Sequence, residues 1–212
     1  MLKRIFALLG LFLAYTAHGM PQSVHNVNGI AVVVQRGNIT QAAAQIIVNA
    51  ANEELLGGAG VCGTIFKAAG WEELQEACDR LAPCKTGSAV ITPSFKLARN
   101  GIKHIIHAVG PDCRIITDPL EQDALLKSAY WESLDLADMH GATSVAFPFI
   151  SSAIFGFPKG RAARIALNTI NQWAMVHSGS SIKKVYCVLF SDDDALLFKT
   201  LQSQLKNSIS YQ

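Results

Sequence analysis

The sequence predicts an α/β fold in which helices cover both faces of a mostly parallel β-sheet. Short apolar runs rich in β-branched residues alternate with longer amphipathic segments along the chain. The 212 residues are 50% hydrophobic and 16% charged, which is typical of a globule with a sizeable core. No internal repeat, low-complexity tract or linker interrupts the alternation, so we expect one domain.

The predicted strands are short, and in a parallel sheet their carboxyl ends meet at the edge where ligands collect. They cover Ile30–Gln35, Ile46–Val48, Ser88–Thr92, Lys103–Val109, Ser144–Phe149 and Lys184–Phe190. The predicted helices carry apolar residues at helical spacing. They cover the segment from Val61 through Leu81, then Glu121–Met139, Gly160–Val176 and Asp192–Leu205.

The first 19 residues have the pattern of a cleaved signal peptide. Lys3 and Arg4 precede an apolar run from Ile5 to Tyr15, and small residues up to Gly19 follow it. The run is too short to span a bilayer comfortably, so we expect no stable membrane span after cleavage. We therefore expect an exported chain, periplasmic or secreted, with one domain over residues 20–212. If Met20 is the true start, the protein is cytoplasmic.

Charge and cysteine content exclude several classes of protein. Without residues 1–19 the chain has 16 basic and 16 acidic residues and no basic stripe, which argues against duplex nucleic acid as a partner. The five cysteines show no CxxC and no Cys/His metal spacing, so we expect no metal site and no cofactor. Cys78 and Cys84 could pair if a helix ends between them; free, semi-buried thiols are the other reading. We expect a monomer.

Two strand-to-helix junctions have the composition of anion-binding loops. After Ile46–Val48 come a polar bend, Asn49–Asn52, and the glycine cluster Gly57–Gly60, directly before a helix. Glycines there allow backbone N–H groups to converge, and a helix N-terminus adds partial positive charge. After Ser144–Phe149 comes a second small-residue loop, Ser151–Pro158. Two such loops suit a ligand with two linked phosphates.

Five motifs in sequence order resemble the signatures of the macrodomain family. They are GNIT at Gly37–Thr40, NAAN at Asn49–Asn52, GGAGV at Gly57–Val61, HAVGP at His107–Pro111 and SSAIFGFP at Ser151–Pro158. The resemblance runs from about Gly29 to Leu205. It implies a three-layer α/β/α sandwich with a mixed, mostly parallel, six-stranded sheet. It also implies that the partner is ADP-ribose or an ADP-ribosylated protein.

The resemblance further implies a role for each matched residue. Asn38 would face the adenine amino group, Ile39 would line the adenine pocket, and Phe190 would lie near it. Asn52 would hold the hydroxyls of the distal ribose, on which Phe155 would pack. The diphosphate would lie between backbone N–H groups of the two loops. The implied contacts on these loops are Gly58, Ala59, Gly60, Val61, Ser151, Ser152, Ala153, Ile154, Phe155 and Gly156.

The sequence departs from the family pattern in three ways. Asn38 stands where the family usually has Asp, and it keeps a carbonyl acceptor while adding an NH2 donor. Cys62 and Phe66 stand where hydrolytic members have an Asp and a His, and a thiol is mostly neutral at pH 7. Ala153 replaces a common Gly, which would cost roughly 1 kcal/mol if the position needs a positive φ.

These departures leave the activity open between two classes. One is an enzyme that removes ADP-ribose from proteins or deacetylates O-acetyl-ADP-ribose by water attack at the distal ribose, with Asn52 as the orienting group. Cys62 as a covalent nucleophile is a weaker hypothesis for the same site. The other class is a non-catalytic ADP-ribose reader. A remote third class is a nicotinamide oxidoreductase, because Gly58, Gly60 and Gly63 match the dinucleotide-binding motif GxGxxG. Against it, nine residues separate Val48 from Gly58, whereas this motif should follow its strand immediately.

Overall fold

The computed structural model describes residues 22–209. The strands are β1 (Ser23–Val27), β2 (Ile30–Arg36), β3 (Ile46–Ala51), β4 (Ala89–Pro93), β5 (His104–Val109), β6 (Ser144–Phe147) and β7 (Lys184–Leu189). The helices are α1 (Gly60–Ala69), α2 (Trp71–Asp79), α3 (Pro119–Met139), α4 (Lys159–Val176) and α5 (Asp192–Ile209), with short 3₁₀ turns η1 (Ile39–Gln41) and η2 (Phe95–Asn100).

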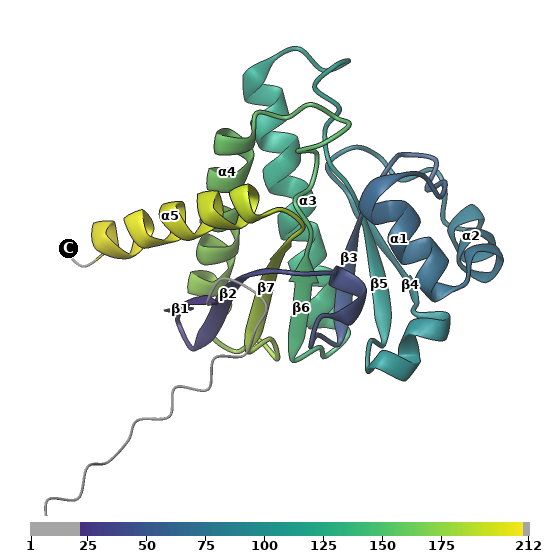
Figure 1. Ribbon diagram of the computed structural model, residues 1–212, viewed down its shortest axis with the longest axis horizontal. Helices are drawn as coiled ribbons and strands as arrows, with labels where there is room; N and C mark the ends of the chain where they lie inside the picture. Colours follow the sequence, from purple (N-terminus) through teal and green to yellow (C-terminus); the bar gives the residue numbers. More distant parts are fainter. Residues whose placement is uncertain (1–21, 210–212) are drawn as a thin grey trace, which may run out of the picture.

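The strands form one mixed sheet between two layers of helices (Figure 1). Their order is β1-β2-β7-β6-β3-β5-β4. The five inner strands are parallel, while β1 and β4 at the two edges run antiparallel to their neighbours. This confirms the predicted three-layer α/β/α sandwich with a mostly parallel sheet, and corrects its size from six strands to seven.

The additional strand is β1, which the apolar pattern does not reveal. Because β1 pairs on one side only, residues 23–26 alternate between partial and full exposure and only its last residue, Val27, is buried, so its sequence SVHNV is correspondingly polar. The inner strands are apolar on both faces, as parallel strands covered by two helical layers must be. Val32 and Val34 pack in the core under α3, α4 and α5, whereas Val33 packs in the core under α1 and α2.

Two of the predicted boundaries were wrong for clear physical reasons. The predicted bend at Asn49 is the continuation of β3, because residues 49–51 pair with His107–Val109 of β5. The predicted helix from Val61 through Leu81 breaks at Gly70, whose φ of 105° separates α1 from α2. Only a residue without Cβ adopts this backbone conformation easily, so the break follows from the glycine.

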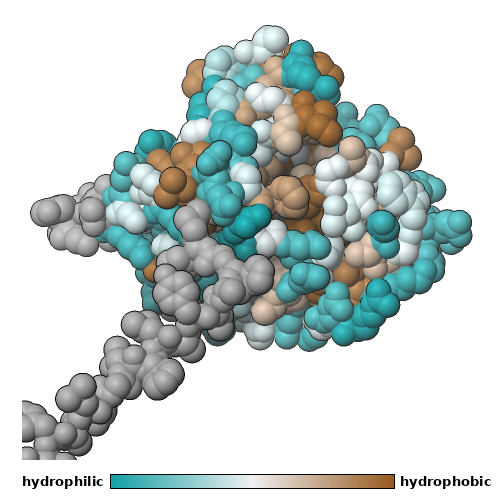
Figure 2. All heavy atoms as spheres, in the orientation of Figure 1, coloured by the Kyte–Doolittle hydropathy of each residue, from teal (hydrophilic) through white to brown (hydrophobic). Residues whose placement is uncertain are grey.

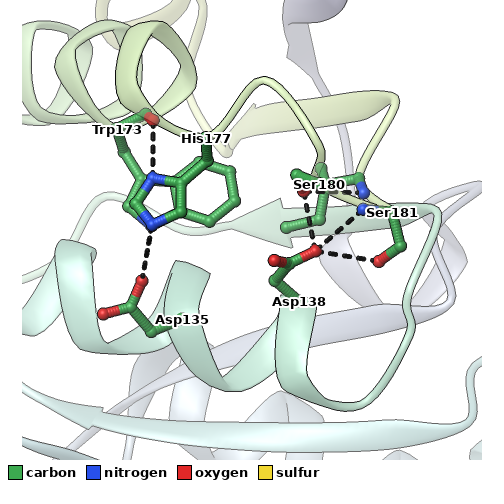
Figure 3. Close-up of polar contacts among 7 residues, drawn as sticks. Asp135, Asp138, Trp173, His177, Ser180 and Ser181 are labelled. Atoms are coloured by element: carbon green, nitrogen blue, oxygen red, sulfur yellow. Dashed lines mark hydrogen bonds and ion pairs between the residues drawn. The ribbon is translucent and has the colours of Figure 1, made fainter.

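All five cysteines are free thiols, so Cys78 and Cys84 do not pair. Near the C-terminal ends of α3 and α4, polar contacts join the two helices (Figure 3). Trp173 Nε1 donates to Asp135 Oδ1 at 2.6 Å, and the His177 ring stacks on the Trp173 ring. Asp138 accepts hydrogen bonds from Ser180 and Ser181, which lead into β7.

Within residues 22–209, no helix is long and apolar enough to cross a bilayer. The predicted signal peptide, residues 1–19, lies outside the described residues, and export stays a prediction.

Candidate functional site

The candidate site lies at the carboxyl ends of β3, β6 and β7, where the two predicted loops leave the sheet. Two adjoining cavities open there. The β3 cavity has a volume of about 270 Å³ and the β7 cavity about 370 Å³. Both are lined by Gly60, Val61, Phe149 and Ala153, so the two loops meet along a shared wall. Figure 2 shows the surface hollowed at this place, with apolar side chains inside.

The first loop delivers the N-terminus of α1 to the β3 cavity. Ala59 is the N-cap residue, and no side chain accepts a hydrogen bond from the first N–H groups of the helix. Gly58, Ala59, Gly60 and Val61 all line the cavity. The uncapped N–H groups and the helix dipole therefore give this wall the character of an anion site.

The second loop is held in a strained conformation. Ser151 has a φ of 60°, which is uncommon for a residue with a side chain. Ser152 Oγ donates to Phe149 O at 2.9 Å, and Phe157 N–H donates to Ser151 O at 3.0 Å. The buried hydroxyl of Ser151 has no hydrogen-bond partner among the described residues, and Ser151 lines the β3 cavity. A ligand oxygen in the cavity would satisfy this hydroxyl.

Ala153 does not carry the strain that its sequence position suggested. Its φ is not positive, so replacing a glycine there has no conformational cost. Among the residues of the second loop, the left-handed positions are Ser151 and Gly156. Gly156 donates its N–H to Ala153 O and lines neither cavity.

The β7 cavity combines an apolar wall with several polar side chains. Ile39 is buried in that wall, whereas Phe190 is 88% exposed at its edge. Asn38 Oδ1 accepts from Thr40 N at 3.0 Å and from Thr40 Oγ1 at 2.9 Å, which caps η1. The Nδ2 donor of Asn38 is thereby left for a ligand. Asp194 also lines this cavity but is paired with Lys159 at 2.7 Å.

In the β3 cavity, Asn52 is the side chain with the best-defined polar orientation. Its Oδ1 accepts from Leu56 N at 3.0 Å, and its Nδ2 donates to Leu56 O at 3.2 Å. An Asn amide has two hydrogens and two lone-pair positions, so one donor and one acceptor remain for a ligand.

Cys62 also lines the β3 cavity, but as a neutral group. Burial raises the pKa of its thiol, outweighing the hydrogen bonds from Asn49 and from the Gly58 backbone that lower it. A protonated thiol is a weak nucleophile, which opposes the covalent role considered for Cys62. Phe66 is fully buried behind the loop and lines neither cavity.

Behind Cys62 lies a buried polar cluster that the sequence did not reveal. Asn49 Nδ2 lies 3.6 Å from Cys62 Sγ and 3.1 Å from His107 Nδ1, and His107 Nε2 lies 3.0 Å from Thr92 Oγ1. Burial lowers the pKa of His107 to about 4, so the imidazole is neutral at pH 7. The β3–β5 register makes Asn49 and His107 cross-strand neighbours, a pairing that only the strand order supplies.

Most of the residues selected from the sequence are therefore brought together. The β3 cavity collects Asn52, the first loop, Cys62, Ser151 and residues 153–155, and the β7 cavity collects Asn38, Ile39, Ser152 and Phe190. The sequence reasoning did not assign the following lining residues: Gly37, Ala50, Ala51, Thr64, Gly110, Pro148, Phe149, Ile150, Val188, Ser191 and Asp194. Four of them could have been found, since Gly37 belongs to the GNIT motif, Ala50 and Ala51 to NAAN, and Gly110 to HAVGP. In residues 22–209, no cluster of three or more His, Cys, Asp or Glu side chains could hold a metal ion.

Comparison with known proteins gives consistent matches. A family model described as Macro domain matches residues 48–166. A macro domain-containing protein of Listeria monocytogenes is 43% identical over 174 residues, covering 80% of this chain and 96% of the relative. An O-acetyl-ADP-ribose deacetylase of Escherichia fergusonii is 41% identical over 175 residues, covering 81% and 94%. The solved structure of the Oceanobacillus iheyensis macrodomain with ADP has a TM-score of 0.81 and 35% identity, covering 89% of this chain and 98% of that one.

Proposed function

The chain belongs to the macro domain family, and from this premise we propose that it binds ADP-ribose across the two adjoining cavities. The observation that carries the proposal is the shared wall of Gly60, Val61, Phe149 and Ala153. In ADP-ribose the diphosphate joins adenosine to a second ribose, called the distal ribose. With the diphosphate at this wall, the adenosine would enter one cavity and the distal ribose the other.

The β7 cavity suits the adenosine half of the ligand. An adenine base would pack on the apolar wall that contains Ile39 and against the exposed ring of Phe190. The Nδ2 of Asn38 would donate to a ring nitrogen, because its Oδ1 already accepts two hydrogen bonds from Thr40. Recognition of adenine by Asn38 thus depends on a donor rather than on a negative charge.

The β3 cavity suits the distal ribose. The N-terminus of α1 and the unpartnered hydroxyl of Ser151 would bind the diphosphate at its entrance. The free donor and acceptor of Asn52 would bind a pair of ribose hydroxyls, and Phe155 would pack on the sugar. We accordingly assign ligand contacts to the loop residues Gly58 to Val61 and Ser151 to Phe155.

Isothermal titration calorimetry with ADP-ribose, ADP and adenosine tests this assignment. We expect ADP to bind more tightly than adenosine, because the diphosphate adds contacts at the shared wall. We expect ADP-ribose to bind more tightly than ADP, because the distal ribose adds contacts in the β3 cavity. Absence of heat with ADP-ribose at millimolar concentration would refute the proposal.

A second candidate function is hydrolysis at the distal ribose, of O-acetyl-ADP-ribose or of an ADP-ribosylated protein. The name of the Escherichia fergusonii relative favours it. Among the described residues, however, no carboxylate and no imidazole lines the β3 cavity. Proton transfer would therefore depend on water and on the phosphates of the substrate, with Asn52 orienting the ribose and the α1 N–H groups stabilising negative charge.

Turnover assays separate an enzyme from a reader. Wild-type protein and Asn52→Ala are incubated with O-acetyl-ADP-ribose and with mono-ADP-ribosylated protein. If the wild type releases acetate or ADP-ribose faster than Asn52→Ala does, the result supports hydrolysis. Equal rates would indicate a non-catalytic ADP-ribose reader. Cys62→Ser is the matched test of a covalent step, and we expect its rate to equal that of the wild type, because the thiol is neutral and has no partner positioned as a base.

A further inference from the structure

A short segment connects β3 to the glycines of the first loop (the glycine loop), and it is fixed by contacts with residues of several elements. We call this segment, Glu53–Gly57, the strap. Glu53 Oε1 accepts from Thr86 N and Oγ1 at 2.8 and 2.7 Å, and Cys84 N–H donates to Glu53 O at 2.8 Å. The Leu55 side chain is fully buried although its φ is 56°. A left-handed leucine persists only where surrounding contacts over-determine it.

On its outer side the strap is held by Gln75 of α2. Gln75 Oε1 accepts from Gly57 N–H at 2.8 Å, and its Nε2 donates to Leu55 O at 3.4 Å. The second Nε2 hydrogen is directed to Asp79 Oδ1 at 2.8 Å, so the whole amide is oriented. Gly57 is pressed against aromatic rings, because a Cβ there would lie 2.7 Å from atoms of Phe66 and Trp71.

On its inner side the strap orients Asn52. The main-chain N–H and C=O of Leu56 bond to Oδ1 and Nδ2 of Asn52, which decides which way the amide faces. The Leu56 carbonyl also accepts from the Cys62 thiol at 3.8 Å. Leu56 therefore connects Leu55 and Gly57, which bond to Gln75, with Asn52, which the proposed function places at the distal ribose.

From this chain of contacts we propose that Gln75 is a positioning residue for the distal part of the ligand. It lines neither cavity, and it acts by fixing Leu55 and Gly57, so that Leu56 presents Asn52 in one orientation. The inference rests on the proposed function, since it assumes that Asn52 binds the distal ribose. It assigns to α2 a part in distinguishing ADP-ribose from ADP, although α2 contacts neither.

The test compares the two nucleotides by calorimetry in wild type, Gln75→Met and Glu76→Met. Methionine keeps the length and helix propensity of glutamine but makes neither hydrogen bond. We expect Gln75→Met to raise the Kd for ADP-ribose about tenfold and that for ADP less than about twofold, since the loss of an oriented hydrogen bond is confined to the ribose. Glu76 lies on the exposed side of the same helix, and its ion-pair partner among the described residues is Arg80, so its variant should match the wild type.

A pH profile distinguishes positioning from a merely structural effect. In Gln75→Glu the introduced carboxyl can donate to Leu55 O only when protonated, and the nearby Asp79 raises its pKa. We expect the ADP-ribose affinity of this variant to improve as the pH is lowered from 7 towards 5, while the affinities of wild type and Gln75→Met change little. Amide exchange at Leu56 and Gly57 should also be faster in Gln75→Met.

Equal losses for ADP and ADP-ribose, or no loss for either, would overturn the role of Gln75 while leaving ADP-ribose binding intact. A wild-type protein that binds neither nucleotide would instead overturn the proposed function, and the inference with it.

Discussion

The β3 cavity and the β7 cavity meet at one wall but are built by different means. Five polar side chains line the β7 cavity, namely Asn38, Thr64, Ser152, Ser191 and Asp194. Among the described residues, the polar side chains that line the β3 cavity are Asn52, Ser151 and the neutral thiol of Cys62, and its remaining polar groups belong to the main chain. A substitution in the β7 cavity should therefore remove one contact at a time, whereas the β3 cavity depends on the path of the backbone.

The largest expected effect is the loss of folding stability in acid, and it comes from the buried polar cluster behind the β3 cavity. The β3 cavity is backed by His107, which is neutral and has a pKa lowered to about 4 by burial. Below pH 6.5 the unfolded chain binds a proton at this residue that the folded chain does not accept until about pH 4. The free energy of unfolding should thus fall by about 3 kcal/mol as the pH falls through that window.

Urea denaturation at pH 7, 5.5 and 4.5 measures this loss, with His107→Gln as the variant that lacks the titrating group. The variant should be less stable at pH 7 but should show a shallower pH dependence than the wild type. If the free energy of unfolding falls equally steeply with pH in the variant and in the wild type, the acid sensitivity belongs to other groups. Examples are His25 and His104, whose pKa values burial also lowers.

The next effect concerns the backbone of the first loop. A Cβ on Gly63 would collide with the carbonyl oxygen of Gly58, so Gly63→Ala must displace the glycine loop. We expect about 2 kcal/mol of lost binding, roughly 30-fold, for ADP and ADP-ribose alike. Calorimetry measures it, with Gly179→Ala as the control, because a Cβ on Gly179 meets nothing within 4 Å. Undiminished ADP affinity would contradict the dependence on backbone path.

A smaller and more selective effect is expected at Asn52. Asn52→Ala removes the one oriented amide of the β3 cavity, so the Kd for ADP-ribose should rise about tenfold while that for ADP changes little. Competition binding with the two nucleotides gives both values. If ADP loses affinity by the same factor, Asn52 acts on the glycine loop rather than on the ribose.

The smallest effect should come from Phe190 in the β7 cavity. Because its side chain is 88% exposed, Phe190→Ala should leave the melting temperature unchanged. Affinity for both nucleotides should fall about threefold, since each places adenine against this ring. A loss restricted to ADP-ribose would mean that adenine and ribose occupy the opposite cavities.

The strand and helix predictions succeeded where local pattern and tertiary environment agree. Buried apolar runs such as Ile46–Val48 are strands in any parallel sheet, and Ser144–Phe149 differs from β6 only by the two residues that enter the loop. Prediction failed where pairing overrides composition. Ser23–Val27 is a strand because β2 offers it a partner, and Asn49 is in β3 because β5 pairs beside it.

The sequence by itself determined the alternation of strands and helices, the two small-residue loops and the family resemblance, because each depends on residues close together along the chain. Only the tertiary structure decided that the neighbouring strands β3 and β6 bring those loops to one wall, that Asn49 meets His107, and that Gln75 supports Asn52 through the strap. These contacts join segments brought together by strand order and helix packing, which local residue patterns do not encode.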